Sequence, residues 1–124
     1  MIKEGEEKMV KPIIIKNTED GVEYTLEFNR ESVKFAEMRG FKIDDLGEYP
    51  MTKIPELFFY AFRMHHKNVS REKTDKILFE ELGGIPEGML ERLAELYAQP
   101  FEALTIVNEE EGEERKKSKF QVEF

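Results

Sequence analysis

Two adjacent histidines, His65 and His66, are the side chains that first suggest a metal site or a general base. Neighbouring helical positions point about 100° apart, so the two imidazoles cannot share a metal ion as an i, i+4 pair does. A catalytic role would need a carboxylate brought close by the fold, and no acidic pair stands out for it. The plainer interpretation places one histidine at the edge of the core and the other in solvent. We therefore expect no catalytic residue, no metal and no cofactor.

Other motifs of catalysis or cofactor binding are missing from the sequence. The chain has no cysteine, which excludes disulfides, thiolate zinc sites and thiol nucleophiles. Gly83-Gly84 lacks the lysine and the strand-to-helix context of a phosphate-binding loop, and no Gly-x-Ser-x-Gly sequence is present. A glycine pair at this place is typical of a helix stop. The sequence therefore favours a protein that is not an enzyme.

A helix-turn-helix spacing is present in the second half of the chain, over residues 70–82 and 86–98. The second helix would read the major groove. Its outward positions are almost all acidic: Glu87, Glu91, Glu95 and Glu102. These carboxylates would repel phosphates, and the formal net charge of the chain is -8. We therefore expect no nucleic-acid partner.

The helix predicted to begin at Thr52 is more apolar than a single buried face requires. Its main stripe follows helical spacing: Ile54, Leu57, Phe58, Ala61, Phe62 and His65. Phe59, Tyr60 and Met64 lie beyond this stripe, and such residues commonly anchor protein interfaces. The alternative is that the helix is buried on both sides, between the sheet and the last helices. Phe59, Tyr60 and Met64 are candidate partner-binding residues.

Charge is sorted along the chain, which gives a second candidate interface. Basic side chains predominate early in the second half: Arg63, Lys67, Arg71, Lys73 and Lys76. Glu87, Glu91 and Glu95 form an acidic stripe whose i, i+4 repulsion does not stabilise a helix. The basic band of one copy and the acidic stripe of another would form a head-to-tail homo-oligomer. Two solvated faces are the alternative, and the three glutamates are candidate partner-binding residues.

The elements that must position these residues follow from the hydrophobic pattern. Period-two alternation predicts a hairpin from residues 11–16 and 22–28, joined at Asp20-Gly21. Asn29 and Ser70 are expected to cap helices. The last helix is expected to begin at Pro86, bend at Pro100 and end near Val107. A further loop with apolar anchors is expected over residues 41–51.

The last five residues predict a third strand, because Phe120, Val122 and Phe124 alternate with polar residues. If each buried side chain stabilises the fold by ~1.5–3 kcal/mol, a chain ending at Glu110 would lose several kcal/mol of stability. The predicted fold class is α+β. A small three-stranded antiparallel sheet, made of the N-terminal hairpin and the C-terminal strand, would pack against four to five helices.

Length and composition predict one domain over residues 1–124, with 40% hydrophobic residues. Residues 1–10 are expected to be a flexible N-terminus, and the charge block at 108–119 a mobile loop. No apolar run reaches the ~20 residues of a membrane-spanning helix, and the start does not resemble a signal peptide. Together with the missing cysteines, this predicts a cytoplasmic protein without a membrane partner.

Three segments carry a resemblance to a known group of proteins. The strand-to-helix opening at residues 23–29 resembles that of tail assembly chaperones encoded beside the tape measure gene in long-tailed phages and prophages of Gram-positive bacteria. Residues 57–66 and 82–90 are similar to a family of uncharacterised phage and prophage proteins of that group. The resemblance implies a non-enzymatic role in virion assembly, binding the tape measure or tail tube protein. It transfers no site residue, and residues 120–124 depart from it.

Two other function classes remain open at this point. One is a small phage-encoded regulatory or adaptor protein that binds a host protein, which a position in an early-gene cluster would indicate. The other is a hydrolase that uses His65 or His66 with a carboxylate. A structure with neither histidine in a cleft beside an acid would exclude the hydrolase.

Overall fold

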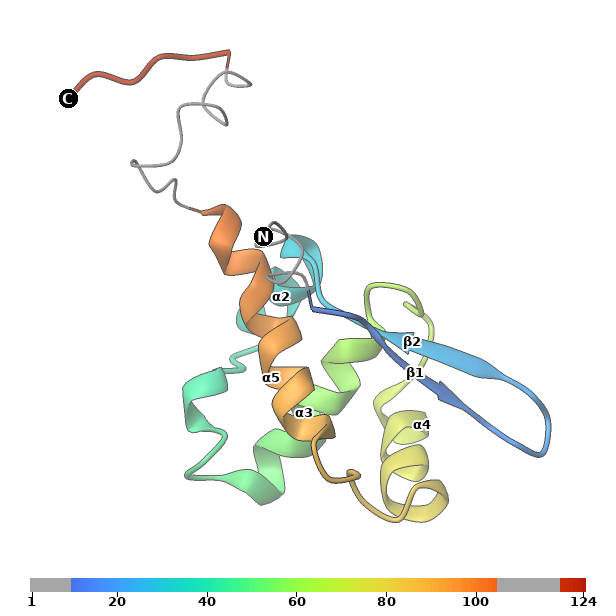
Figure 1. The fold of residues 1–124 in the computed structure, drawn as a ribbon. Helices are drawn as coiled ribbons and strands as arrows, with labels where there is room; N and C mark the ends of the chain where they lie inside the picture. Colours follow the sequence, from blue (N-terminus) through green and yellow to red (C-terminus); the bar gives the residue numbers. More distant parts are fainter. Residues whose placement is uncertain (1–9, 105–118) are drawn as a thin grey trace.

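The computed structural model describes residues 10–104 and 119–124 (Figure 1). The predicted flexible segment 1–10 and mobile loop 108–119 lie outside this part of the chain, except for their residues Val10 and Lys119. Val10 is half-buried, and its N–H donates to Gln99 Oε1 at 2.6 Å. The chain is therefore attached to the helical part of the fold from Val10 onward.

The predicted hairpin is confirmed, with strands shorter than expected. β1 (Ile13–Lys16) pairs antiparallel with β2 (Glu23–Leu26), and Ile13 lies opposite Leu26. Asn17 shapes the connection, since its side chain accepts the Glu19 N–H at 2.8 Å. Gly21 has a φ of 77°, the left-handed conformation that favours glycine. The turn residues thus act as the sequence predicts.

The predicted third strand is wrong. Residues 119–124 contain no strand, and the sheet of the described residues has two strands, within an α+β fold. Phe120 and Val122 are 82% and 76% exposed, and Phe124 is fully exposed. Figure 1 shows this segment, in red, well apart from the hairpin. Alternation alone does not bury a strand, because a sheet edge and an apolar surface must also be available to it.

The first described helix, α2 (Arg30–Met38), has the ends that its sequence predicts. Asn29 Oδ1 accepts the Ser32 N–H at 2.9 Å, and Ser32 Oγ accepts the Asn29 N–H at 2.9 Å. This reciprocal capping box satisfies two N–H groups at the start of the helix. At the other end of the helix, Gly40 is left-handed with a φ of 90°. The chain reverses there, and the Phe41 N–H donates a hydrogen bond to the Ala36 carbonyl at 3.0 Å. Phe41 is thereby directed into the core.

The predicted loop at 41–51 contains a short 3-10 helix, η1 (Ile43–Asp45), and then the start of α3 (Pro50–Phe62). Helix α3 begins two residues earlier than expected because Pro50 occupies its first turn, where a proline costs no hydrogen bond. Helix α3 ends at Phe62, so His65 and His66 lie beyond the helix.

The last two described helices follow in the second half of the chain. Ser70 caps α4 (Arg71–Lys76), as predicted, and the helix continues with π geometry through η2 (Ile77–Glu81). Helix α5 (Met89–Ala98) begins later than predicted, because Gly88 is left-handed with a φ of 87°. A 3-10 turn, η3 (Gln99–Ala103), contains Pro100, so α-helical geometry ends just before the proline at which a bend is predicted. The predicted end of this helix near Val107 lies outside the described residues.

Helix α3 is the centre of the fold. It packs against β2, α2, α4 and α5, and Figure 1 shows α5 running in front of it. The buried apolar residues come from β2, α2, α3, η2 and α5 and from the segments on either side of α2: Leu26, Phe28, Val33, Ala36, Phe41, Leu57, Phe58, Tyr60, Ala61, Phe62, Ile77, Leu78, Leu93, Leu96 and Tyr97. The alternative interpretation of the apolar α3, burial between the sheet and the last helices, therefore accounts for most of its apolar side chains.

Candidate protein-binding surfaces

His66 connects the hairpin to the end of α3 by a hydrogen bond and a ring contact. Its Nε2 accepts the backbone N–H of Thr25 at 2.9 Å, and its ring packs edge-on against Tyr24 with centroids 5.2 Å apart. An imidazole nitrogen that accepts a hydrogen bond carries no proton. Burial, with a smaller contribution from His65, lowers the pKa of His66 below its ordinary 6.5 and keeps it neutral. His66 thus has a structural role at the edge of β2.

His65 is paired with a carboxylate, at the surface of the molecule. Its Nε2 lies 2.8 Å from Glu27 Oε1, and both side chains are partly exposed. A histidine–carboxylate pair is a component of hydrolytic sites, where the histidine in turn activates a hydroxyl or a water. Among the described residues, no serine, threonine or lysine side chain is hydrogen-bonded to either member of this pair. The pair therefore presents no activated nucleophile of the chain itself.

Metal-binding clusters and membrane-spanning helices are both absent from the part of the chain that the structure describes. Residues 10–104 and 119–124 hold no cluster of three or more histidine, aspartate or glutamate side chains that could bind a metal ion. No helix in this part of the chain combines the length and the apolar character needed to cross a bilayer.

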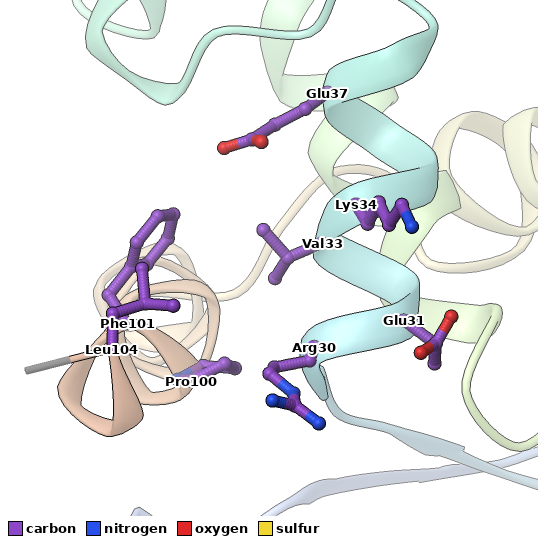
Figure 2. A pocket seen from close by; sticks show the side chains of 8 residues that line it. All are labelled: Arg30, Glu31, Val33, Lys34, Glu37, Pro100, Phe101 and Leu104. Carbon is purple, nitrogen blue, oxygen red and sulfur yellow. The ribbon is translucent and has the colours of Figure 1, made fainter.

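A groove with an apolar floor lies between α2 and η3, and we call it the α2–η3 groove (Figure 2). It measures about 310 Å³. Its lining comes from the two elements: Arg30, Glu31, Val33, Lys34, Glu37, Pro100, Phe101 and Leu104. In Figure 2, Val33, Arg30 and Glu37 extend from α2 toward η3, whereas Glu31 and Lys34 turn away. Positions 30, 33 and 37 share one helix face, so the helical repeat itself produces this wall.

Two apolar side chains of the groove remain in contact with solvent. Phe101 is 38% exposed and Leu104 is 65% exposed, at the far wall from Val33. Arg30 and Glu37 lie at the rim, so charged groups border this apolar surface. Apolar side chains that are exposed together and rimmed by polar groups are typical of protein-binding surfaces.

The predicted partner-binding residues of α3 are placed unequally. Tyr60 is 7% exposed, and its ring contacts the rings of Phe35, Phe41 and Phe59. Burial, together with Glu56, raises the pKa of the Tyr60 phenol above 10.0. Phe59 and Met64 are half-buried, so only part of each side chain can reach a partner. Tyr60 belongs to the core rather than to a surface.

The three predicted glutamates are all exposed. Glu91 and Glu95 lie one turn apart on α5, as the spacing predicts. Glu87 lies in the turn before α5, because the helix starts only at Met89. The acidic stripe is therefore a helical pair with a third carboxylate before it.

The α2–η3 groove was not anticipated from the sequence. Phe101 and Leu104 follow Pro100 at a spacing that returns close to the apolar face of the helix before it, so the spacing by itself does not indicate a groove. The proline was the available signal, because the 3-10 turn around it rotates the following residues away from the α-helical face. The position of α2 opposite them is a tertiary feature.

Comparison with known proteins places the chain in a family. Residues 9–124 match the model of a family described as a domain of unknown function, DUF5055. No curated protein and no solved structure matches the chain. The family description names no activity and no partner, but the match includes the hairpin, α2 to α5 and the C-terminal residues. The chain therefore belongs to the DUF5055 family.

Proposed function

We propose that the protein is a non-enzymatic tail assembly chaperone, acting in the cytoplasm of a bacterial host on the tape measure or tail tube protein of a phage or prophage. The observation that carries the proposal is the α2–η3 groove, with Phe101 and Leu104 exposed opposite Val33. The resemblance of residues 57–66 and 82–90 to phage and prophage proteins of that group supports it from the sequence.

The groove suits an apolar segment of a partner. Covering Phe101 and Leu104 removes apolar surface from water, which stabilises a complex by up to ~1.5–3 kcal/mol for each large side chain. Arg30 and Glu37 at the rim can pair with polar groups beside such a segment. The net charge of -8 keeps a protein with exposed apolar side chains soluble.

Co-expression with a phage tape measure protein tests the proposal. Tagged protein should retain the tape measure protein on an affinity resin and increase its soluble fraction. Leu104→Asp, which places a charge in the groove without disturbing a buried residue, should reduce capture at least tenfold. Met51→Asp is the matched control, because Met51 is 89% exposed and lies outside the groove.

Two results would overturn the proposal. One is the absence of a complex with both the tape measure and the tail tube protein. The other is equal capture by Leu104→Asp and Met51→Asp, which would show that the α2–η3 groove is not the contact. Retention of a host protein instead would favour the regulatory or adaptor function.

A further inference from the structure

A second groove lies on the other side of α2, away from η3. Its volume is about 390 Å³, and it is bounded by α2 and by the residues that follow α3. Glu31 contributes a carboxylate to its lining. Lys34, Arg63 and Lys67 outweigh it in positive charge, while Phe35, Met38 and Met64 supply apolar surface. We call these six residues the basic groove. Within a chain of net charge -8, this is a local concentration of cations.

Two guanidinium groups of this region are held in place by one aromatic ring. The Arg63 guanidinium carbon lies 3.8 Å from the centroid of the Phe35 ring, and that of Arg39 lies 4.5 Å from it. Stacking on a ring restricts an arginine side chain and leaves its N–H groups free to bind carboxylates. No ion pair joins Arg39, Arg63, Lys34 or Lys67 to a carboxylate within the described residues.

Arg71 of the predicted basic band differs in this respect. Arg71 Nε lies 2.9 Å from Asp75 Oδ1 on the same helix, so its charge is already neutralised. Lys73 and Lys76 form no ion pair within the described residues either, but no cation–π contact orders their side chains there. The ordered cations without an ion pair therefore lie at the junction of α2 and α3, which makes this junction the candidate contact in place of α4.

The complementary surface is on α5 of the same molecule. Glu91, Ala94, Glu95 and Ala98 share one helix face, which we call the acidic face, and none of its carboxylates forms an ion pair within the described residues. The small alanines allow close approach of bulky apolar side chains. Carboxylates one turn apart can pair with two neighbouring cations, one of them the ordered guanidinium of Arg63.

We propose that the basic groove of one copy binds the acidic face of α5 in a second copy. The carboxylates of Glu91 and Glu95 pair with Arg63 and Lys67, while Met38 and Met64 pack over the alanines. Different surfaces of the two copies meet, so the contact is heterologous and can extend to further copies. This contact is independent of the α2–η3 groove and of the proposed function.

Light scattering after size-exclusion chromatography tests the contact with the full chain. At 100 µM protein, the average mass should exceed that of a monomer in 20 mM salt and return to it in 500 mM salt. Glu91→Lys combined with Glu95→Lys should weaken association at least tenfold. Glu72→Lys combined with Glu80→Lys is the matched control, with the same change in net charge on exposed positions of α4 and η2.

A charge swap provides the decisive measurement. Arg63→Glu combined with Lys67→Glu should also give a monomer, but an equimolar mixture with the Glu91→Lys, Glu95→Lys variant should associate again. Each variant then offers the other a complementary surface. A monomer at both salt concentrations would overturn the proposal, as would equal association of the α5 variant and its control, or a mixture that remains monomeric.

Discussion

Individual residues show most directly how the hairpin is joined to the helices. On the outer edge of β2, the Thr25 N–H donates to His66 Nε2 at 2.9 Å. Just after the strand, the Glu27 N–H donates to the Ala61 carbonyl at 3.0 Å. A strand edge whose backbone N–H and C=O groups are unpaired can pair with a strand of another molecule. The end of α3 and the histidine after it thus occupy the edge of β2 that β1 leaves open.

The neutral state of His66 predicts a pH dependence of stability. Its pKa in the folded protein is lowered below 6.5, so the unfolded chain binds more protons in the interval below that value. The free energy of unfolding should therefore fall as the pH drops through 6.5. Urea unfolding between pH 8 and pH 5 measures it.

His66→Gln isolates this residue, because glutamine offers an acceptor oxygen and does not titrate. The variant should lose part of the decline in stability below pH 6.5. His65→Gln is the control for the neighbouring pair with Glu27. Identical pH profiles for the wild type and His66→Gln would contradict the assignment.

The Asn29 cap gives a second prediction at this scale. Asn29→Ala removes the acceptor of the Ser32 N–H and should cost about 1 kcal/mol of unfolding free energy. Asn68→Ala, in an exposed turn, should change it by less than ~0.5 kcal/mol. Chemical denaturation of both variants measures the difference, and equal losses would show that the cap does not hold α2.

At the scale of elements, the helices differ in how far local sequence determined their limits. Helix α2 has a capping box and a glycine stop, and its predicted ends agree with the structure. Helix α5 follows Pro86, a favourable first residue, but begins three positions later because Gly88 is left-handed. Several neighbouring residues can favour the first position of a helix. The packing of the buried side chains then determines at which of them the helix begins.

The docking of α5 on α3 predicts a large effect of a single truncation. Leu93 on α5 is fully buried in the core, so Leu93→Ala should reduce the unfolding free energy by about 2–5 kcal/mol. Met51→Ala, an exposed position of α3, should stay within ~0.5 kcal/mol of the wild type. Urea denaturation compares them. A loss below ~1 kcal/mol for Leu93→Ala would mean that α5 packs loosely.

At the scale of the whole molecule, the core closes without the C-terminal residues. Helix α3 is surrounded by β2, α2, α4 and α5, and rings such as Phe28 and Tyr97 meet edge to face with centroids 5.0 Å apart. The side chains of Phe120 and Val122 are 82% and 76% exposed and that of Phe124 is fully exposed, so most of their apolar surface lies outside this packing. They are apolar surface presented to solvent.

Removing residues 119–124 should therefore change the unfolding free energy by less than ~0.5 kcal/mol. This expectation replaces the loss of several kcal/mol that a third strand would imply. Thermal and urea unfolding of the shortened and full-length chains compare the two outcomes. A loss of several kcal/mol would show that these residues are buried in solution.

The sequence by itself determined the local features of this protein. The hairpin, the cap at Asn29, the cap at Ser70 and the end of α5 before Pro100 depend on residues close to one another in the chain, where turn and cap chemistry is decisive. The sequence also identified α3 as unusually apolar, because its period and composition are local properties. The acidic stripe at Glu91 and Glu95 was visible for the same reason.

Only the tertiary structure decided which surfaces meet. Alternation could not show whether Phe120 and Val122 find a sheet edge, and spacing could not show that Tyr60 is covered by Phe35 and Phe41. The pairing of His66 with Thr25 joins residues 41 positions apart. Both grooves beside α2 likewise arise from segments distant in sequence, because burial is a property of the assembled core and is not encoded at a single position.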